Sequence, residues 1–401
     1  MFAGTVGAGI LGYVFQVLMG RMLSTADYGL FNALMALFAV FSAPLATLLM
    51  IVARKVSEYR ARNDYGSIRQ FYFSITLWTT LVSALILGVT LLAAPDLQAY
   101  LKSPAQGPIY LFAALLFFSF FPILNDGFLQ GLQSFSWLSA STALRTFLRI
   151  VFCAGLIMSG LGVSGAVAGA MLSSIAGWAV TYWPLRRRLG HGGSPRFLRD
   201  HLRFRQSAPV FVANIAFAVM TQFDMVLVNH YFPAHEAGLY AAASILGKAV
   251  MYLPSGIAMA LFPMVAEDHA RDKSSAHLLV QAVGLTSVLC LAGAMFYFVL
   301  GQPLIEVLYG EAYRAAGEVL RYFGFAILPM ALVMVAEYFL IAKGRVLFAY
   351  LFMFTAPLEV FAIALWHGSL QTIVAIVGAS GATLAAIGYA MLWQSYRAAR
   401  K

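Results

Sequence analysis

Seven charged side chains lie inside stretches of sequence that are otherwise almost entirely apolar. They comprise four carboxylates and three basic groups: Asp126, Arg145, Arg149, Asp224, Lys248, Glu337 and Glu359. An ionisable side chain is costly within a hydrocarbon layer, so it is found there mainly where it pairs, faces water or serves a function. The three basic groups are therefore candidate ligands for an anionic substrate. The four carboxylates are candidates for ion coupling or for neutralising a buried charge.

Two of the carboxylates can pair with a basic group in the helix that follows. Asp126 and Arg145 stand nine residues before and ten residues after a short polar turn. Both would lie about 14 Å from that turn at 1.5 Å per residue. Asp224 and Lys248 stand 11 residues before and 13 residues after another turn. Each pair could neutralise itself within the membrane, which does not exclude a functional role.

Arg149 has no such partner nearby in the sequence. It follows Arg145 by four residues, so the two guanidiniums share one face of a helix. Its distance from the preceding turn is about 21 Å, past the middle of a bilayer. If both guanidiniums face a watery cavity, they form a fork suited to phosphate or carboxylate. The alternative is that Arg149 extends to the inner membrane surface.

The composition of the chain indicates that lipid, and not water, surrounds most of it. Only 10% of the 401 residues are charged and 61% are hydrophobic, whereas a soluble globular domain has about 25% charged residues. Because helices satisfy their own backbone hydrogen bonds in lipid, the sequence predicts an all-α polytopic membrane protein. A spanning helix needs about 20 apolar residues. About twelve stretches fit: 2–20, 30–53, 71–94, 109–131, 135–159, 165–184, 207–229, 239–262, 278–300, 319–342, 346–365 and 370–393.

Basic residues are concentrated in the connections on one side of these helices. Of the 26 Lys and Arg residues, 19 fall on one face, mostly in 54–70 and 185–206, and three fall on the other. By the positive-inside rule the basic face is cytoplasmic. The distribution predicts a multi-pass protein of the inner (cytoplasmic) membrane with both termini inside. We expect this face to meet anionic lipid headgroups rather than nucleic acid.

The two halves of the chain resemble each other. Residues 25–33, Thr-Ala-Asp-Tyr-Gly-Leu-Phe-Asn-Ala, align with 234–242, Ala-His-Glu-Ala-Gly-Leu-Tyr-Ala-Ala, at an offset of 209. We infer two pseudo-symmetric six-helix bundles that arose by duplication. The N-terminal bundle is expected at 1–184, a basic cytoplasmic linker at 185–206 and the C-terminal bundle at 207–401.

A parallel repeat of this kind suits alternating access around a site near the membrane midplane. The alternative is a duplication kept for packing alone. The repeat pairs Asp126 with Glu337, which would lie near the inner surface, where a merely interfacial position is an alternative. It places Glu359 one residue before the equivalent of Arg149, so the halves would present opposite charges at similar depth.

Other motif matches do not support enzyme chemistry. Residues 7–12, Gly-Ala-Gly-Ile-Leu-Gly, have the spacing of a dinucleotide-binding turn, but they lie inside the first spanning segment without a βαβ unit. These glycines, like Gly165 and Gly169, more simply predict close approach of neighbouring helices. Neither a phosphate-binding loop nor metal-ligand spacing is present in the sequence. We therefore expect no ATP hydrolysis, no cofactor, no metal and no catalytic residue.

Four short stretches, in order along nearly the whole chain, carry a family resemblance. They are Gly20-Arg-Met-Leu-Ser-Thr-Ala-Asp-Tyr-Gly-Leu-Phe31, Leu129-Gln-Gly-Leu-Gln-Ser-Phe135, the segment from Asp224 to Pro263, and Leu308-Tyr-Gly-Glu-Ala-Tyr313. In them the chain resembles the polysaccharide-biosynthesis flippases, which carry lipid-linked oligosaccharides. These belong to the multidrug/oligosaccharidyl-lipid/polysaccharide exporter superfamily. The order and spacing of the four stretches are specific to the superfamily. They are less specific to the cargo that a member carries.

The resemblance implies alternating access and export of a polyprenyl-diphosphate-linked glycan, as in O-antigen, lipopolysaccharide or exopolysaccharide synthesis. The anionic head would enter a central, cationic cavity between the halves, held by Arg145 and Arg149, while the prenyl tail stays in lipid. Asp224 or Glu359 would couple H⁺ or Na⁺. The expected partners are the lipid-linked glycan, membrane lipids and other polysaccharide assembly proteins.

Two other functional classes remain open. A cation-coupled multidrug exporter of the same superfamily would be favoured by an excess of cavity carboxylates, and Arg145 and Arg149 argue the other way. A membrane glycan polymerase, ligase or glycosyltransferase usually needs a sizeable outer loop or a cytoplasmic catalytic domain. The longest outer connection here is only about 301–317. A purely structural scaffold would leave the intramembrane charges unexplained.

Overall fold

The computed structural model describes residues 2–189, 204–252, 254, 265, 276–342 and 347–399. Within these ranges the chain is helical, apart from short turns, and contains no strand. The all-α prediction is therefore confirmed. The predicted linker falls mostly outside the described residues, as do Phe262-Pro263 and the basic groups Arg196, Arg199, Arg203, Arg271, Lys273, Lys343, Arg345, Arg400 and Lys401.

The chain divides into two compact units, Met1–Asn214 and Ile215–Lys401. The first contains α1 (Phe2–Met22), α2 (Thr25–Ala61), α3 (Tyr65–Leu92), α4 (Ala94–Tyr100), α5 (Gly107–Gly131), α6 (Phe135–Leu156) and α7 (Gly162–Leu189). Helix α8 (Phe204–Tyr231) begins in the first unit and ends in the second. The second unit continues with α9 (Ala234–Tyr252), α11 (Ala276–Tyr309), α12 (Ala316–Ala342), α13 (Leu347–Leu365) and α14 (Leu370–Ala399).

Each predicted spanning segment overlaps one of these helices; the second half of the segment 239–262, from residue 253 on, lies almost entirely outside the described residues. Eight stretches of the described chain are long and apolar enough to cross a membrane, and one of them, Phe135–Leu189, contains both α6 and α7. Helix α13 supplies a shorter apolar stretch, Tyr350–Leu365. The prediction of about twelve membrane helices is confirmed, and α4 is an additional short helix that hydropathy did not predict.

Helices α2 and α3 begin several residues before their predicted apolar segments because capping side chains start them. The Ser24 hydroxyl accepts a hydrogen bond from the Asp27 N–H at 3.1 Å at the start of α2. The Asp64 carboxylate does the same for the Ser67 N–H at 2.9 Å at the start of α3 and also accepts from the Ser67 hydroxyl. These two hydrogen bonds hold the pKa of the exposed Asp64 carboxyl below its ordinary value.

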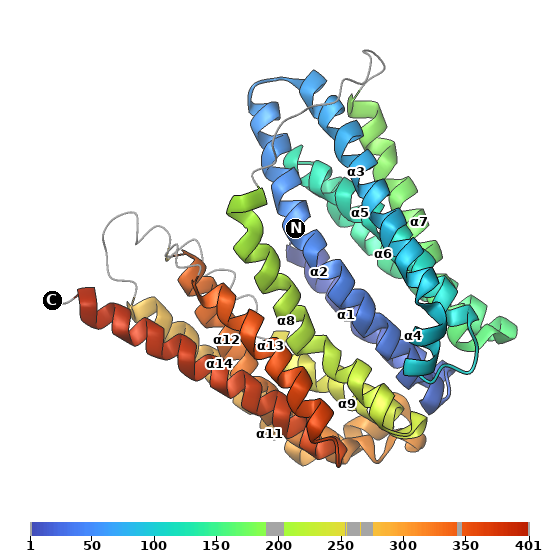
Figure 1. Cartoon of the computed structure of the whole chain (residues 1–401), viewed down its shortest axis with the longest axis vertical. Coiled ribbons are helices and arrows are strands. Elements are labelled where there is room, and N and C mark those ends of the chain that lie inside the picture. Colours follow the sequence, from blue (N-terminus) through green and yellow to red (C-terminus); the bar gives the residue numbers. More distant parts are fainter. Residues whose placement is uncertain are drawn as a thin grey trace. The chain divides into compact units, whose positions relative to one another are not determined.

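Helices α2, α3 and α5 of the first unit share a hydrophobic core, and α6 packs closely on α7 (Figure 1). A Cβ added at Gly169 of α7 would lie 2.5 Å from the Cys153 backbone nitrogen of α6, and one at Gly165 would lie 2.8 Å from Leu156. The predicted close approach at these two glycines is confirmed. It is wrong for Gly9 and Gly12, since a Cβ there would meet no described atom within 4 Å.

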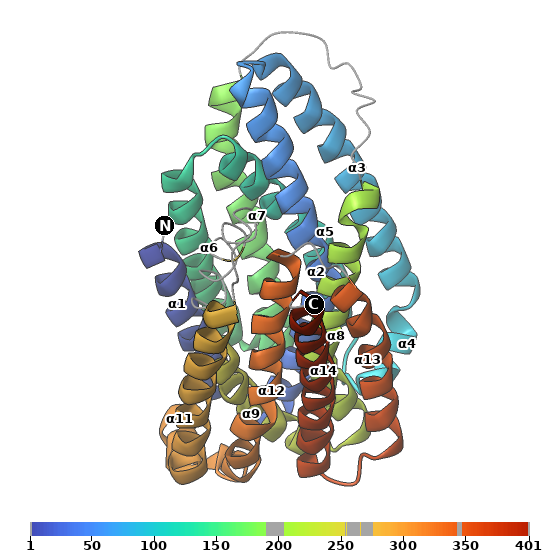
Figure 2. The ribbon, with the colours of Figure 1, turned by 90° about the vertical axis from the view of Figure 1, so that its left-hand side faces the viewer.

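In the second unit α12 lies between α11 and α14 and also packs on α9 (Figure 2). A Cβ added at Gly324 of α12 would lie 2.8 Å from the Cα of Ala294 on α11. A Cβ at Gly247 of α9 would meet the ring of Phe323 at 2.5 Å. Small residues therefore bring these helices together, as expected where apolar area alone drives no association in lipid.

Candidate functional site

A cavity of about 270 Å³ in the first unit brings Arg145 and Arg149 together. Both project from α6, and four hydroxyl side chains share the lining: Ser119 of α5, Thr146 of α6, and Ser173 and Ser174 of α7. The remaining lining is apolar and comes from α2, α5 and α7. Two guanidiniums surrounded by hydroxyls can donate hydrogen bonds to an anionic or sugar-bearing group.

Arg145 is ion-paired with Asp126 of α5. Its Nη2 lies 2.8 Å from the Asp126 Oδ2, and both side chains are largely buried. Gly177 of α7 makes room for this arginine, because a Cβ there would lie 2.7 Å from the Arg145 Cδ. The pairing that the turn spacing allowed is present. One guanidinium charge of the cavity is thus compensated, and the Asp126 Oδ1 has no hydrogen-bond partner among the described residues.

The guanidinium of Arg149 lies 4.0 Å from the ring centroid of Phe15 on α1. Its buried Nε has no hydrogen-bond partner within the described part of the chain. A cation over an aromatic face keeps its hydrogen-bonding edge available for a ligand. With two guanidiniums and one carboxylate, the site has an excess of one positive charge. Phe15 gave no signal in the sequence, since it is one of many apolar residues in the first span.

A second cluster of charges lies in the second unit. The Lys248 Nζ of α9 is 2.9 Å from both carboxylate oxygens of Asp224 on α8. The Tyr240 hydroxyl donates to the Asp224 Oδ2 at 2.7 Å. All three residues are at most 7% exposed. The Asp224–Lys248 pair is also one that the spacing from the turn allowed. The sequence did not indicate that Tyr240 would contact Asp224.

Glu359 of α13 is a further charge of the same cluster. It is 3% exposed, interacts electrostatically with both Asp224 and Lys248, and contacts the Ser380 hydroxyl of α14. Its Oε2 has no hydrogen-bond partner among the described residues. The cluster thus contains two carboxyl groups and one ammonium group, and the described ion pair of Lys248 is with Asp224.

Glu337 belongs to the second unit and lies on α12. It is half-buried, five residues before the end of α12 at Ala342. The repeat made it the counterpart of Asp126, but no described ion pair involves it.

Two family profiles match the chain. The polysaccharide biosynthesis protein family matches residues 1–269, and the MatE family matches residues 209–365. No curated protein sequence matches it significantly.

Solved structures of low sequence identity share the fold. An inward-facing multidrug resistance MATE family transporter of the MOP superfamily aligns with a TM-score of 0.81 at 13% identity, covering 97% of this chain and 94% of that chain. The lipid II flippase MurJ in an inward closed conformation gives 0.79 at 12% identity, covering 98% and 87%. A MOP superfamily transporter from Pyrococcus furiosus with a binding pocket of reverse polarity gives 0.70 at 16% identity, covering 98% and 94%.

These likenesses define the fold as that of a MOP superfamily transporter, as the sequence resemblance implied. The chain belongs to the polysaccharide biosynthesis protein family, whose profile covers more than half of its length. It is accordingly a multi-pass membrane protein of a transporter family.

Proposed function

We propose that this protein translocates a polyprenyl-diphosphate-linked oligosaccharide from the inner to the outer leaflet of the cytoplasmic membrane. The observation that carries the proposal is Arg149, a cation with no carboxylate partner among the described residues, in a hydroxyl-lined cavity. A diphosphate is the group that such a cavity would attract, because guanidinium–phosphate hydrogen bonds are short and charge-assisted. The hydroxyls would meet the remaining phosphate oxygens or the first sugar.

In this proposal the two arginines have different roles. Arg149 contacts the diphosphate directly, since its guanidinium lies over the Phe15 ring and its Nε has no hydrogen-bond partner among the described residues. Arg145 is shared with Asp126 and adds a second, weaker attraction. The surplus positive charge leaves room for an anion but not for a cationic drug, which the cavity would repel.

Ion coupling is assigned to the cluster in the second unit. Lys248 and Tyr240 already bind the oxygens of Asp224. Glu359 is therefore the carboxylate with an oxygen left for H⁺ or Na⁺. Binding and release of that cation would shift the equilibrium between the conformation in which the head site opens to the cytoplasm and the one in which it opens to the outside. The shift requires that the cation bind the two conformations with different affinities.

A second candidate function is a cation-coupled multidrug exporter. It is favoured by the MatE match over residues 209–365 and by the surplus carboxylate of the second unit. Deleting the gene and analysing membrane lipids by mass spectrometry separates the two. Accumulation of a lipid-linked glycan supports the flippase. No accumulation, together with new sensitivity to cationic dyes, supports the exporter.

The orientation has its own test. With both termini in the cytoplasm, a single cysteine at Arg62 would resist a membrane-impermeant thiol reagent in intact cells and react after permeabilisation. A cysteine at Lys102, which the charge distribution places on the other side, would react in intact cells. Both positions are exposed, and the native Cys153 and Cys290 are buried. Labelling of Arg62→Cys but not Lys102→Cys from outside would invert the topology.

A further inference from the structure

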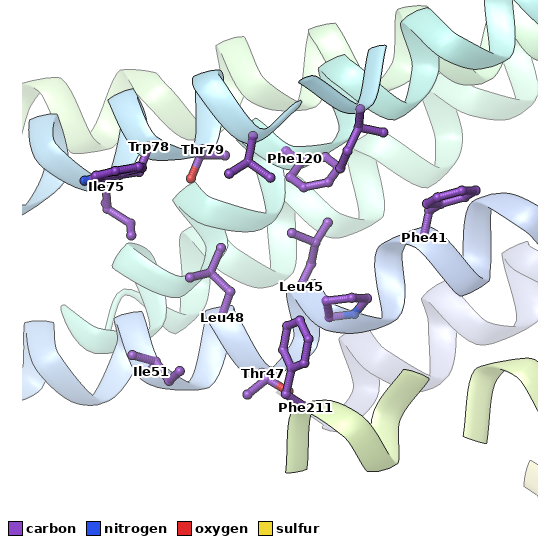
Figure 3. A pocket seen from close by; sticks show the side chains of 13 residues that line it. Phe41, Leu45, Thr47, Leu48, Ile51, Ile75, Trp78, Thr79, Phe120 and Phe211 are labelled. Carbon is purple, nitrogen blue, oxygen red and sulfur yellow. The ribbon is translucent and has the colours of Figure 1, made fainter. Parts of the chain in front are cut away.

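The first unit contains a second cavity, which is almost entirely apolar and has no part in the proposed binding of the head group. It measures about 540 Å³ and is lined by side chains of α2, α3 and α5 and by Phe211 of α8 (Figure 3). Of its 13 lining residues, eleven are apolar and the other two are threonines. Figure 3 shows Phe41 at one end and Ile75 and Trp78 at the other, with Leu45 and Leu48 between them. The volume lies within the roughly 300–1,000 Å³ of small-molecule sites.

Specific residues hold this cavity open. Pro44 lies inside α2 and lines the cavity; because proline has no N–H, the helix loses one hydrogen bond there and can bend away from its neighbours. Thr47, also in the lining, accepts a hydrogen bond from the Asn214 Nδ2 at 2.9 Å, which fixes the start of α8 against α2. Phe211 of α8 then closes one side.

The apolar cavity and the cationic one are lined by residues of the same two helices, α2 and α5. On α2, Phe38 lines the cationic cavity and Phe41 lines the apolar one. Their positions are three apart, which corresponds to a rise of about 4.5 Å on the same helix face. On α5, the successive residues Ser119 and Phe120 line the cationic and the apolar cavity respectively. One molecule with an anionic head and an apolar chain would match this arrangement.

We propose that the apolar cavity binds the head-proximal isoprene units of the same lipid whose diphosphate lies at Arg149. This inference rests on the proposed function. It differs from the expectation given by the sequence in that the protein holds part of the prenyl tail, which therefore does not lie wholly in the bilayer. Sugars do not suit the cavity, since it offers only two hydroxyls. Four aromatic side chains, Phe41, Trp78, Phe120 and Phe211, would instead pack against the methyl-branched, unsaturated chain.

The binding preference would come from shape rather than from the hydrophobic effect. A tail that leaves lipid for the cavity exchanges one apolar environment for another. Its gain is limited to closer packing with the cavity wall, together with the tethering of the chain by the bound head. We therefore expect a modest factor, about threefold to tenfold in Kd, and selection of the cargo by its lipid as well as by its glycan.

Filling the cavity tests the inference. Val82 lines it from α3 and is 46% exposed, so Val82→Trp can reduce its volume without disturbing the buried core. Leu85→Trp is the matched control, since Leu85 lies on the same helix, is 68% exposed and is not among the lining residues. Ile86→Phe provides a second filling variant. Purified full-length protein in nanodiscs would be titrated with undecaprenyl diphosphate, inorganic diphosphate and dioleoyl phosphatidylglycerol.

Val82→Trp and Ile86→Phe are expected to weaken undecaprenyl diphosphate binding about threefold to tenfold and to leave inorganic diphosphate binding unchanged. Leu85→Trp should change neither. Unchanged undecaprenyl diphosphate binding in both filling variants would overturn the tail site. So would an equal loss of phosphatidylglycerol binding, which would identify an ordinary acyl-chain groove. Arg149→Ala distinguishes the two proposals: if it leaves binding of both diphosphates intact, the head site and the proposed function fail.

Discussion

Replacing Arg149 by alanine is expected to stop export while the protein remains folded and inserted. The side chain contributes a guanidinium with a buried, unpartnered Nε to a hydroxyl-lined cavity. Its removal leaves no buried carboxylate uncompensated, because Asp126 keeps Arg145. Losing one charge-assisted contact to the diphosphate would cost about 1.5–3 kcal/mol, or about tenfold to a hundredfold in affinity. Lipid-linked glycan would then accumulate on the cytoplasmic leaflet.

The measurement is the amount of lipid-linked glycan by mass spectrometry in cells with the wild-type protein, Arg149→Ala or no protein. Arg149→Lys should restore export only in part, because an ammonium keeps the charge and loses the planar fork. Arg54→Ala is the control: Arg54 has an 81% exposed side chain in a surface pair with Glu58, and its loss should leave export intact. Wild-type glycan levels in Arg149→Ala cells would show that Arg149 is not a headgroup ligand.

The spans and the two buried ion pairs could be predicted from the sequence because both depend on local geometry. Lipid imposes an apolar run on each helix, and the runs are visible without a structure. A turn of only three residues joins α5 and α6. The depth of Asp126 and of Arg145 in the membrane can therefore be estimated by counting residues from that turn. The same holds for Asp224 and Lys248 across the turn between α8 and α9.

The other members of each site do not stand out in the sequence, and Phe15 and Glu359 come from helices that are distant in sequence from their partners. Phe15 meets Arg149 through packing of α1 on α6, and Tyr240 reaches Asp224 from the same helix as Lys248. Neither an aromatic residue in an apolar run nor a tyrosine near a turn is unusual enough to be noticed. Glu359 was noticed for its charge, but its place beside the Asp224–Lys248 pair follows from the packing of α13 and could not be counted from any turn.

The repeat was a weaker guide to charges than to helices. It paired Asp126 with Glu337, yet the ion pair of the second unit is formed by α8 and α9, which correspond to α1 and α2 of the first. A duplication of the kind that the sequence predicts would preserve the apolar pattern, since every copy must remain in lipid. A buried charge can be lost or gained in one copy as soon as its partner changes with it.

Removing Lys248 alone is expected to destabilise the protein more than removing Lys248 and Asp224 together. The Lys248→Ala variant leaves Asp224, which is 1% exposed, as a buried carboxylate without its cation, in the same cluster as the buried carboxyl group of Glu359. Breaking a buried ion pair from one side costs about 3–5 kcal/mol, since the remaining charge is uncompensated. In the double variant with Asp224→Ala, the Tyr240 hydroxyl loses an acceptor, which costs about 1–3 kcal/mol, but the larger penalty is removed.

The free energy of unfolding would be followed by thermal or denaturant titration of the purified protein, with the two single variants and the double variant compared as a cycle. Arg54→Ala serves as the control, because Arg54 has an 81% exposed side chain paired with Glu58 at 3.2 Å and should contribute about 0–1 kcal/mol. A double variant as unstable as the two single variants combined would mean that Asp224 and Lys248 are not coupled. Partial recovery in the double variant would establish the pair and leave Glu359 as the group that remains to bind a cation.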